Sequence, residues 1–251
     1  MIVWPQGVAN AGSLFALECA HREINDRDPA LSISQRTERT EEHLLREEEG
    51  IQFEYEIRTG LASHHKVFDL GLIEDFNERT EATLKAIKRG DWVIVGAALP
   101  AFEGRSGAPD ILVRDASQED ENHYYFPIDI KNHKPLEGTS KPQKHLISTL
   151  EGIAKEQAAE EEIGPGTPNS NDSLILSHYW RLLEGLKIAP GGEPFGAIIG
   201  SDKRVVWRSL NLSLSEYDEQ FSARLSALFA LAEHKPPHTR PVWNSKWCPQ
   251  C

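Results

Sequence analysis

The sequence predicts an α/β fold in which helices flank a central sheet, and two observations support this prediction. A helical pattern over Glu74–Arg89 stops at Gly90, a residue type that commonly follows the last turn of a helix. Apolar runs rich in β-branched and aromatic residues follow at Trp92–Val95, Ile111–Val113 and Tyr124–Ile130, as expected for buried strands. The order helix, strand, strand, strand predicts a meander packed against the preceding helix.

The N-terminal part reads as largely helical. Apolar residues at helical spacing predict a helix over Gly12–Asn25, and a Glu-rich pattern predicts another over Thr37–Gly50, with Gly50 as its cap. The segment Ile51–Leu61 is compatible with either helix or strand.

The C-terminal half continues the alternation of helices and strands. Gly104–Gly107 is expected to be a turn and Gly164–Asp172 a loop. The remaining elements are expected to be a helix at Leu146–Glu162, a helix at Ser173–Lys187, two hairpin strands at Phe195–Gly200 and Arg204–Leu210, and a last helix starting at Ser213 or Ser215. We expect residues 1–251 to form one domain with its core at about 74–232.

Bulk composition excludes some classes of protein. The 251 residues are 39% hydrophobic and carry a formal charge of −12, so long-range attraction to nucleic acid or anionic membranes is not expected. The longest largely apolar run, Trp92–Phe102, is too short for the roughly 20 residues of a membrane span, and the first residues lack the pattern of a signal peptide. Three cysteines cannot complete a disulfide framework, which favours a reducing cytoplasm.

Two acids and one lysine lie at the ends of neighbouring predicted strands. Asp110 follows Pro109 directly before one strand, and Asp129 lies near the end of the next, two residues before Lys131. Side chains alternate along a strand, so Asp129 and Lys131 share a face while Ile130 points into the core with its carbonyl free to face a metal. Carboxylates on rigid elements can hold Mg²⁺ or Mn²⁺ for phosphodiester hydrolysis, and a lysine can orient water or bind phosphate.

These residues resemble the PD-(D/E)XK nuclease superfamily: Pro109-Asp110 is followed by Asp129-Ile130-Lys131. Within it, the chain is similar to the RecB-like nucleases, including exonucleases of CRISPR adaptation. The resemblance implies a restriction-endonuclease-like core with a mixed central sheet, and a metal site of Asp110, Asp129 and the Ile130 carbonyl with Lys131 as the third catalytic residue. It also implies DNA, linear or single-stranded, as substrate, and a helicase or a defence or repair complex as partner.

The chain departs from the family pattern at two polar positions. Phe53 stands where the family often has a metal-binding histidine, which leaves Glu54 as the upstream ligand candidate or as a salt-bridged surface residue. Ile175 stands where the family's Gln-x-x-x-Tyr helix has its glutamine, while Tyr179 matches the tyrosine. Tyr179 is therefore either a DNA contact or a core aromatic. Lys134, beyond the strand, is a candidate phosphate contact.

The cysteines resemble the iron–sulfur staple of the same family. Cys248 and Cys251 have the C-x2-C spacing of a metal knuckle, and the Pro-rich arm 234–251 could return them to Cys19. The family uses four cysteines for a 4Fe-4S cluster, and this chain has three. His21 as a fourth ligand to zinc is the alternative, and no metal at these residues is a third.

The sequence therefore predicts a metal-dependent DNA nuclease with little sequence specificity. The alternative is a binding module that keeps the nuclease fold without turnover, favoured by the apolar Phe53 and Ile175. A third possibility is a nuclease module from a longer helicase–nuclease or toxin-like chain.

Overall fold

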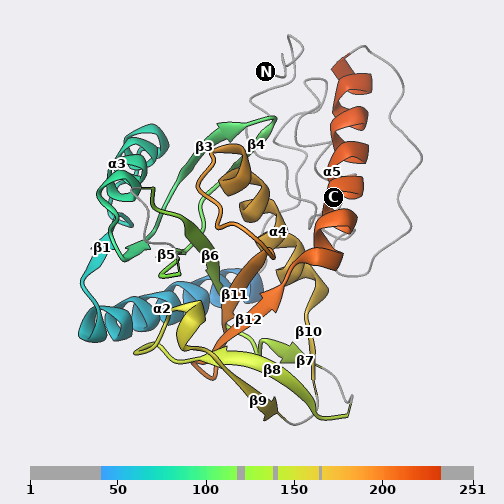
Figure 1. The fold of residues 1–251 in the computed structure, drawn as a ribbon. Helices are drawn as coiled ribbons and strands as arrows, with labels where there is room; N and C mark the ends of the chain where they lie inside the picture. Colours follow the sequence, from blue (N-terminus) through green and yellow to red (C-terminus); the bar gives the residue numbers. More distant parts are fainter. Residues whose placement is uncertain (1–40, 118–121, 138–140, 164–165, 233–251) are drawn as a thin grey trace.

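A computed structural model describes residues 41–117, 122–137, 141–163 and 166–232. Its centre is an eight-stranded mixed sheet of strand order β1-β2-β5-β6-β11-β12-β8-β9 (Figure 1). The pairs β1–β2 and β6–β11 are parallel, and the other neighbours are antiparallel. In that order the strands are Val67–Asp69, Val93–Val95, Ile111–Arg114, Tyr125–Ile130, Phe195–Ile199, Val205–Ser209, Gln143–Ser148 and Ala159–Ile163.

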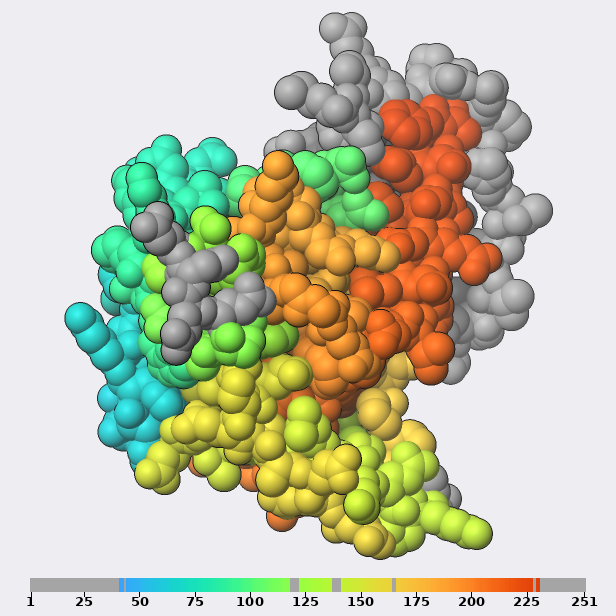
Figure 2. All heavy atoms as spheres, in the orientation of Figure 1, coloured from blue at the N-terminus to red at the C-terminus, as the bar shows by residue number. Residues whose placement is uncertain are grey.

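Four helices accompany the sheet in the described part of the chain. They are α2 (Glu41–His64), α3 (Phe76–Arg89), α4 (Ser170–Gly185) and α5 (Asn211–Ala232). Figure 1 shows α4 running close to the middle of the sheet with α5 beside it. Figure 2 shows the same arrangement from the surface, where α5 forms one side of the molecule, α3 the opposite side, and β8 and β9 the lower edge.

Among the described residues, four short strands and one 3-10 turn lie outside the central sheet. The strands β3 (Leu99–Phe102) and β4 (Arg105–Gly107) form a hairpin, and β7 (Leu136–Glu137) pairs with β10 (Thr167–Pro168). A short 3-10 turn, η2 (Lys155–Gln157), lies between β8 and β9.

The alternation of side chains in the meander divides the core into two clusters. Val93 and Val95 of β2 face the cluster that contains Phe53, Ile57 and Leu61 of α2. Ile94, between them, faces the other cluster, to which α3 and α4 contribute. The sheet is thus covered on both faces, as its continuously apolar strands require.

The structure confirms the α/β class with a mixed sheet flanked by helices. The predicted meander is present as β2, β5 and β6, which are adjacent and antiparallel. The helix expected over Glu74–Arg89 is α3, capped at its start by the Asp75 side chain and ended by Gly90 at φ 73°. The helix expected at Ser173–Lys187 and the hairpin strands after it are also present, as α4, β11 and β12.

The helix predicted to end at Gly50 is wrong in its boundary. α2 continues to His64 and contains Gly50 in its interior. Phe53, Ile57 and Leu61 repeat every four residues and are buried against the sheet, so tertiary packing extends the helix through a glycine. The core therefore begins well before residue 74. The helix expected over 12–25, residues 37–40 and the arm 234–251 lie outside the described residues.

The helix predicted over Leu146–Glu162 is also wrong. This segment forms the end of β8, the turn η2 and most of β9. Leu146, Ile147 and Ser148 pair with β12, and β9 completes the sheet edge with three exposed glutamates. Sheet hydrogen bonding overrides the helical preference of Ala and Glu here. The turn expected at Gly104–Gly107 contains β4, and the loop expected at Gly164–Asp172 contains β10 and the start of α4.

Candidate active site

The antiparallel register of β5 and β6 brings Asp110 and Asp129 together. Ile111, the first residue of β5, pairs with Ile128 of β6, so the residue before β5 lies beside the end of β6. Asp110 Oδ2 accepts a hydrogen bond of 2.7 Å from the Ile130 backbone N–H. Two acids separated by nineteen residues in the sequence are thereby fixed at one end of the sheet.

Lys131 lies on the same face as Asp129, as strand alternation requires. Its Nζ is 2.6 Å from Asp129 Oδ2, and Asp129 is only 3% exposed. The contact is an ion pair by distance, although Asp129 Oδ2 has no partner in hydrogen-bonding geometry among the described residues. Ile130 between them is buried in the core, as predicted.

Glu54 joins these residues from α2. Phe53 is buried against the sheet, and the next residue, Glu54, is half-buried at the border of the core. Glu54 is close enough to Asp110, Asp129 and Lys131 for electrostatic interaction. The apolar Phe53 is therefore a core anchor that places the neighbouring carboxylate of Glu54 at the site.

Burial and neighbouring charges shift the pKa values of Asp110 and Lys131 in this cluster. The pKa of Asp110 is raised well above its ordinary value, first by burial of its carboxylate and then by Asp129 and Glu54. Burial alone would lower the pKa of Lys131, but Asp129 and Asp110 raise it above its ordinary value. Lys131 is therefore a stable cation at neutral pH.

A pocket of about 450 Å³ opens beside the acids. One wall comes from α2 and carries Glu49, Glu54 and Arg46, and a basic wall comes from the segment after β6. The pocket is lined by Arg46, Glu49, Gly50, Glu54, Ile130, Lys131, Asn132 and His133. Its size is within the range of sites for small ligands and single substrate units.

The remaining predicted site residues have other positions. Tyr179 is 6% exposed, and its hydroxyl donates to the Ala108 carbonyl at 3.3 Å, so it supports the segment before Asp110 as a core aromatic. Ile175 is partly buried against the core cluster that includes Tyr179. Lys134 is exposed and does not line the pocket. The expected iron–sulfur cluster or zinc site lies outside the described residues, as do all of its candidate ligands: Cys19, His21, Cys248 and Cys251.

A buried polar scaffold supports the Asp110 segment from behind. His178 of α4 is fully buried, with Nε2 3.0 Å from the Ser106 carbonyl and Nδ1 2.8 Å from the Tyr217 hydroxyl. Because the carbonyl only accepts, Nε2 carries the proton and Nδ1 accepts from Tyr217. At Gly107, an added Cβ would come within 2.9 Å of Tyr179 Cε1, so only glycine fits between strand and helix.

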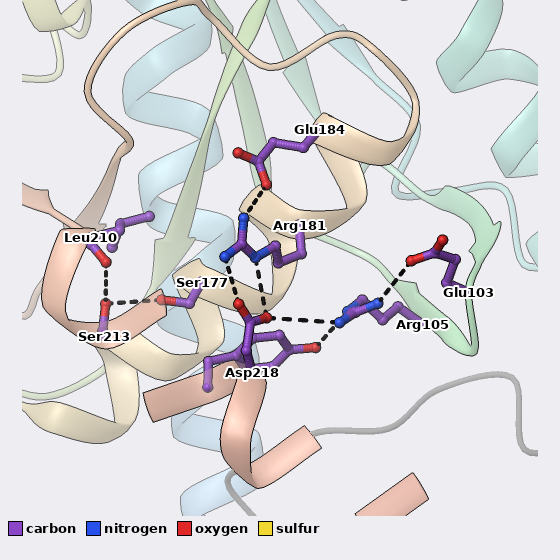
Figure 3. Close-up of polar contacts among 9 residues, drawn as sticks. Glu103, Arg105, Ser177, Arg181, Glu184, Leu210, Ser213 and Asp218 are labelled. Atoms are coloured by element: carbon purple, nitrogen blue, oxygen red, sulfur yellow. Dashed lines mark hydrogen bonds and ion pairs between the residues drawn. The ribbon is translucent and has the colours of Figure 1, made fainter. Parts of the chain in front are cut away.

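A second network attaches α5 to α4 and to the β3–β4 hairpin (Figure 3). Both terminal groups of Arg181 are engaged: Nε and Nη2 donate to the Asp218 carboxylate and Nη1 donates to Glu184 at 2.6 Å. The Arg105 guanidinium lies 3.8 Å from Asp218 and donates to the Tyr217 hydroxyl at 3.1 Å. Asp218 therefore joins two arginines from different elements.

Three residues near the pocket were missed from the sequence. Arg46 belongs to a charged helix without a motif, His133 follows the Asp-x-Lys segment, and Asp172 begins α4. His133 Nε2 lies 3.2 Å from Asp172 Oδ2. No sequence signal links residues 133 and 172, because the contact depends on how α4 meets the end of β6.

Asp110, Asp129 and Glu54 are the candidate cation ligands of this site. Among the residues that the structure describes, no group of three or more His, Cys, Asp or Glu side chains is already arranged to hold an ion. Mg²⁺, however, commonly takes only one or two carboxylates, completed by water and substrate phosphate. The raised pKa of Asp110 beside the Asp129 carboxylate fits such an ion, because its charge would offset the repulsion between the two carboxylates.

Comparisons with protein-family models, with curated proteins and with solved structures give no match. None of the described helices is both long and apolar enough to cross a membrane.

Proposed function

We propose that this chain is a metal-dependent nuclease that hydrolyses phosphodiester bonds in DNA with little sequence specificity. The observation that supports it most is the convergence of Asp110, Asp129 and Lys131 with Glu54 beside a pocket. Residues from two strands and a helix meet there, in the combination of acids and a cation that phosphoryl transfer needs.

Each residue has a distinct role in this proposal. Asp110 and Asp129 would hold Mg²⁺ or Mn²⁺, with Glu54 and the Ile130 carbonyl as further candidate ligands. When bound, the ion would supply a water of lowered pKa and neutralise charge on the phosphoryl oxygens. Lys131, a stable cation beside Asp129, would bind the phosphate as a point charge. The Asp110–Ile130 hydrogen bond keeps the two strand ends in place during this chemistry.

The test is hydrolysis of linear double-stranded and single-stranded DNA with Mg²⁺ or Mn²⁺, using Asp110→Asn, Asp129→Asn and Lys131→Met. Each variant should lose at least about 100-fold in rate, because removing a single electrostatic stabiliser commonly costs that much. Asp202→Asn, in an exposed turn, is the matched control and should remain active. Equal activity of wild type and Asp129→Asn would show that a contaminating nuclease is responsible.

The non-catalytic alternative has one supporting observation, the direct contact of Lys131 with Asp129, which could neutralise that acid permanently. Phe53 and Ile175 no longer favour it, because both pack against core clusters. Calorimetric titration with Mn²⁺ separates the two: the nuclease proposal expects binding by the wild type that Asp110→Asn and Asp129→Asn remove. Absence of Mn²⁺ binding, together with DNA binding and no turnover, would favour the alternative.

A further inference from the structure

The basic wall of the pocket contains His133, whose ring contacts a buried carboxylate. His133 is 38% exposed and lines the pocket two residues after Lys131. Its backbone position is fixed by the neighbouring strand β11 and the turn after it: Lys131 N–H donates to the Ile199 carbonyl and Ser201 N–H donates to the His133 carbonyl, both at 2.9 Å. The side chain is therefore presented at a defined position beside the proposed active site.

A buried carboxylate orients the His133 ring. Asp172 is 2% exposed, and its Oδ2 lies 3.2 Å from His133 Nε2 and 3.6 Å from the buried guanidinium of Arg208. Because a carboxylate only accepts hydrogen bonds, Nε2 carries a proton, which fixes the ring orientation and leaves Nδ1 for a ligand. Donation from Nδ1 to a phosphate oxygen requires the imidazolium form, in which both ring nitrogens carry a proton.

A second cation faces the pocket from α2. Arg46 lines it, and among the residues that the structure describes its one ion-pair partner is Glu42, one helical turn away in an exposed pair. Exposed pairs of this kind contribute little to stability, so the guanidinium can exchange Glu42 for another anion at low cost. Arg46, Lys131 and His133 thus line one pocket together with Glu49 and Glu54, in a chain whose formal charge is −12.

We propose that His133, oriented by Asp172, forms with Arg46 a subsite for a phosphate group of the nucleic-acid strand, next to the scissile phosphate that a metal ion held by Asp110 and Asp129 would bind. This inference rests on the proposed function for the identity of the strand. In an acidic protein, global attraction cannot supply phosphate affinity, so it must come from local cations. Asp172 is a positioning residue here, since it acts only through His133.

The test measures binding separately from cleavage. Fluorescence anisotropy with a labelled single-stranded oligothymidine in EDTA gives the dissociation constant at several salt concentrations. His133→Ala and Arg46→Ala should each weaken binding up to about fivefold and lower the slope of log K against log salt by about 0.7, the value for one lost phosphate contact to a single strand. His133→Lys, which keeps a cation, should restore most of the slope.

Matched controls exist for both variants. Lys85 forms an equally exposed pair with Glu81, four residues away on α3, and His64 is an exposed histidine at the end of α2, ten residues beyond Glu54. Lys85→Ala and His64→Ala should leave the slope unchanged. Equal losses in these controls, or no salt-dependent binding by the wild type, would overturn the subsite.

Oligonucleotides with and without a 5′-phosphate identify the source of the phosphate. A His133→Ala effect confined to the phosphorylated strand assigns the subsite to a terminal phosphate, and an equal effect in both assigns it to an internal one. Hydrolysis with Mn²⁺ is measured on the same preparations. If the wild type does not cleave DNA but His133→Ala still lowers the salt slope of binding, the nuclease proposal alone is rejected. If the wild type cleaves DNA but His133→Ala leaves the salt slope unchanged, the subsite alone is rejected.

Discussion

Lowering the pH should weaken the fold through His178, the buried histidine behind the Asp110 segment. Burial lowers its pKa from 6.5 to about 4 in the folded protein, against a smaller opposing effect of the Ser106 carbonyl, and nearby Arg105 lowers it further. Unfolding exposes the imidazole, which then takes up a proton at a higher pH. The unfolded state therefore binds more protons between these two pKa values, and stability must fall as the pH falls.

The expected size follows from the two pKa values. His178 titration should make the free energy of unfolding about 2 kcal/mol smaller at pH 5 than at pH 7. Most of the contribution present above pH 6.5 is lost as the pH approaches 4. Protonation would also require Nδ1 to donate, although it now accepts from the Tyr217 hydroxyl.

Other groups titrate over the same range, so the measurement compares variants rather than pH values alone. His178→Gln removes the titration and retains an amide that can donate to the Ser106 carbonyl. Urea unfolding at pH 7 and pH 5, followed by circular dichroism, gives the difference between wild type and variant at each pH. That difference should change by about 2 kcal/mol in favour of the variant at pH 5. A change below about 0.5 kcal/mol would refute the assignment of a buried neutral His178.

Two further predictions concern stability. Gly90→Ala should lower the free energy of unfolding by about 1 kcal/mol, because Gly90 has a φ of 73°. Gly50→Ala should raise it by about 0.5–1 kcal/mol, because Gly50 lies in the interior of α2 and nothing lies within 4 Å of the new Cβ. Urea unfolding of both variants checks the opposite signs. Asp218→Asn should lower stability by about 1 kcal/mol because Asp218 bridges Arg181 and Arg105 at a partly exposed site (Figure 3), and the loss should shrink at 1 M salt. Thermal unfolding alongside Asp202→Asn measures it, and equal effects of the two substitutions would contradict a bridging role.

Local sequence was sufficient for the meander and for α3. The run Val93–Val95 is apolar throughout because it is buried on both faces, and such a run can be recognised without tertiary information. The Asp75 cap and Gly90 set the limits of α3 by local hydrogen bonding and backbone conformation. Asp129 and Lys131 share a face for an equally local reason, the pleat of one strand.

Elements stabilised by distant partners were not predictable in this way. β8 and β9 contain residues with helical preference, and only the pairing of β8 with β12 and of β9 with β8 makes them strands. α2 passes through Gly50 because Phe53, Ile57 and Leu61 bury one face against a sheet formed later in the chain. Local propensities are a fraction of a kilocalorie per residue, so such packing overrides them.

For the candidate site, the sequence by itself determined the two acids and the lysine, because strand ends and side-chain alternation are local properties. Only the tertiary structure decided what surrounds them. The β5–β6 register places Asp110 against Ile130, α2 brings Glu54 and Arg46, and α4 places Asp172 behind His133. These residues lie 20 or more positions apart in the sequence, and their relative geometry is set by the packing of helices on the sheet, which no spacing within one segment encodes.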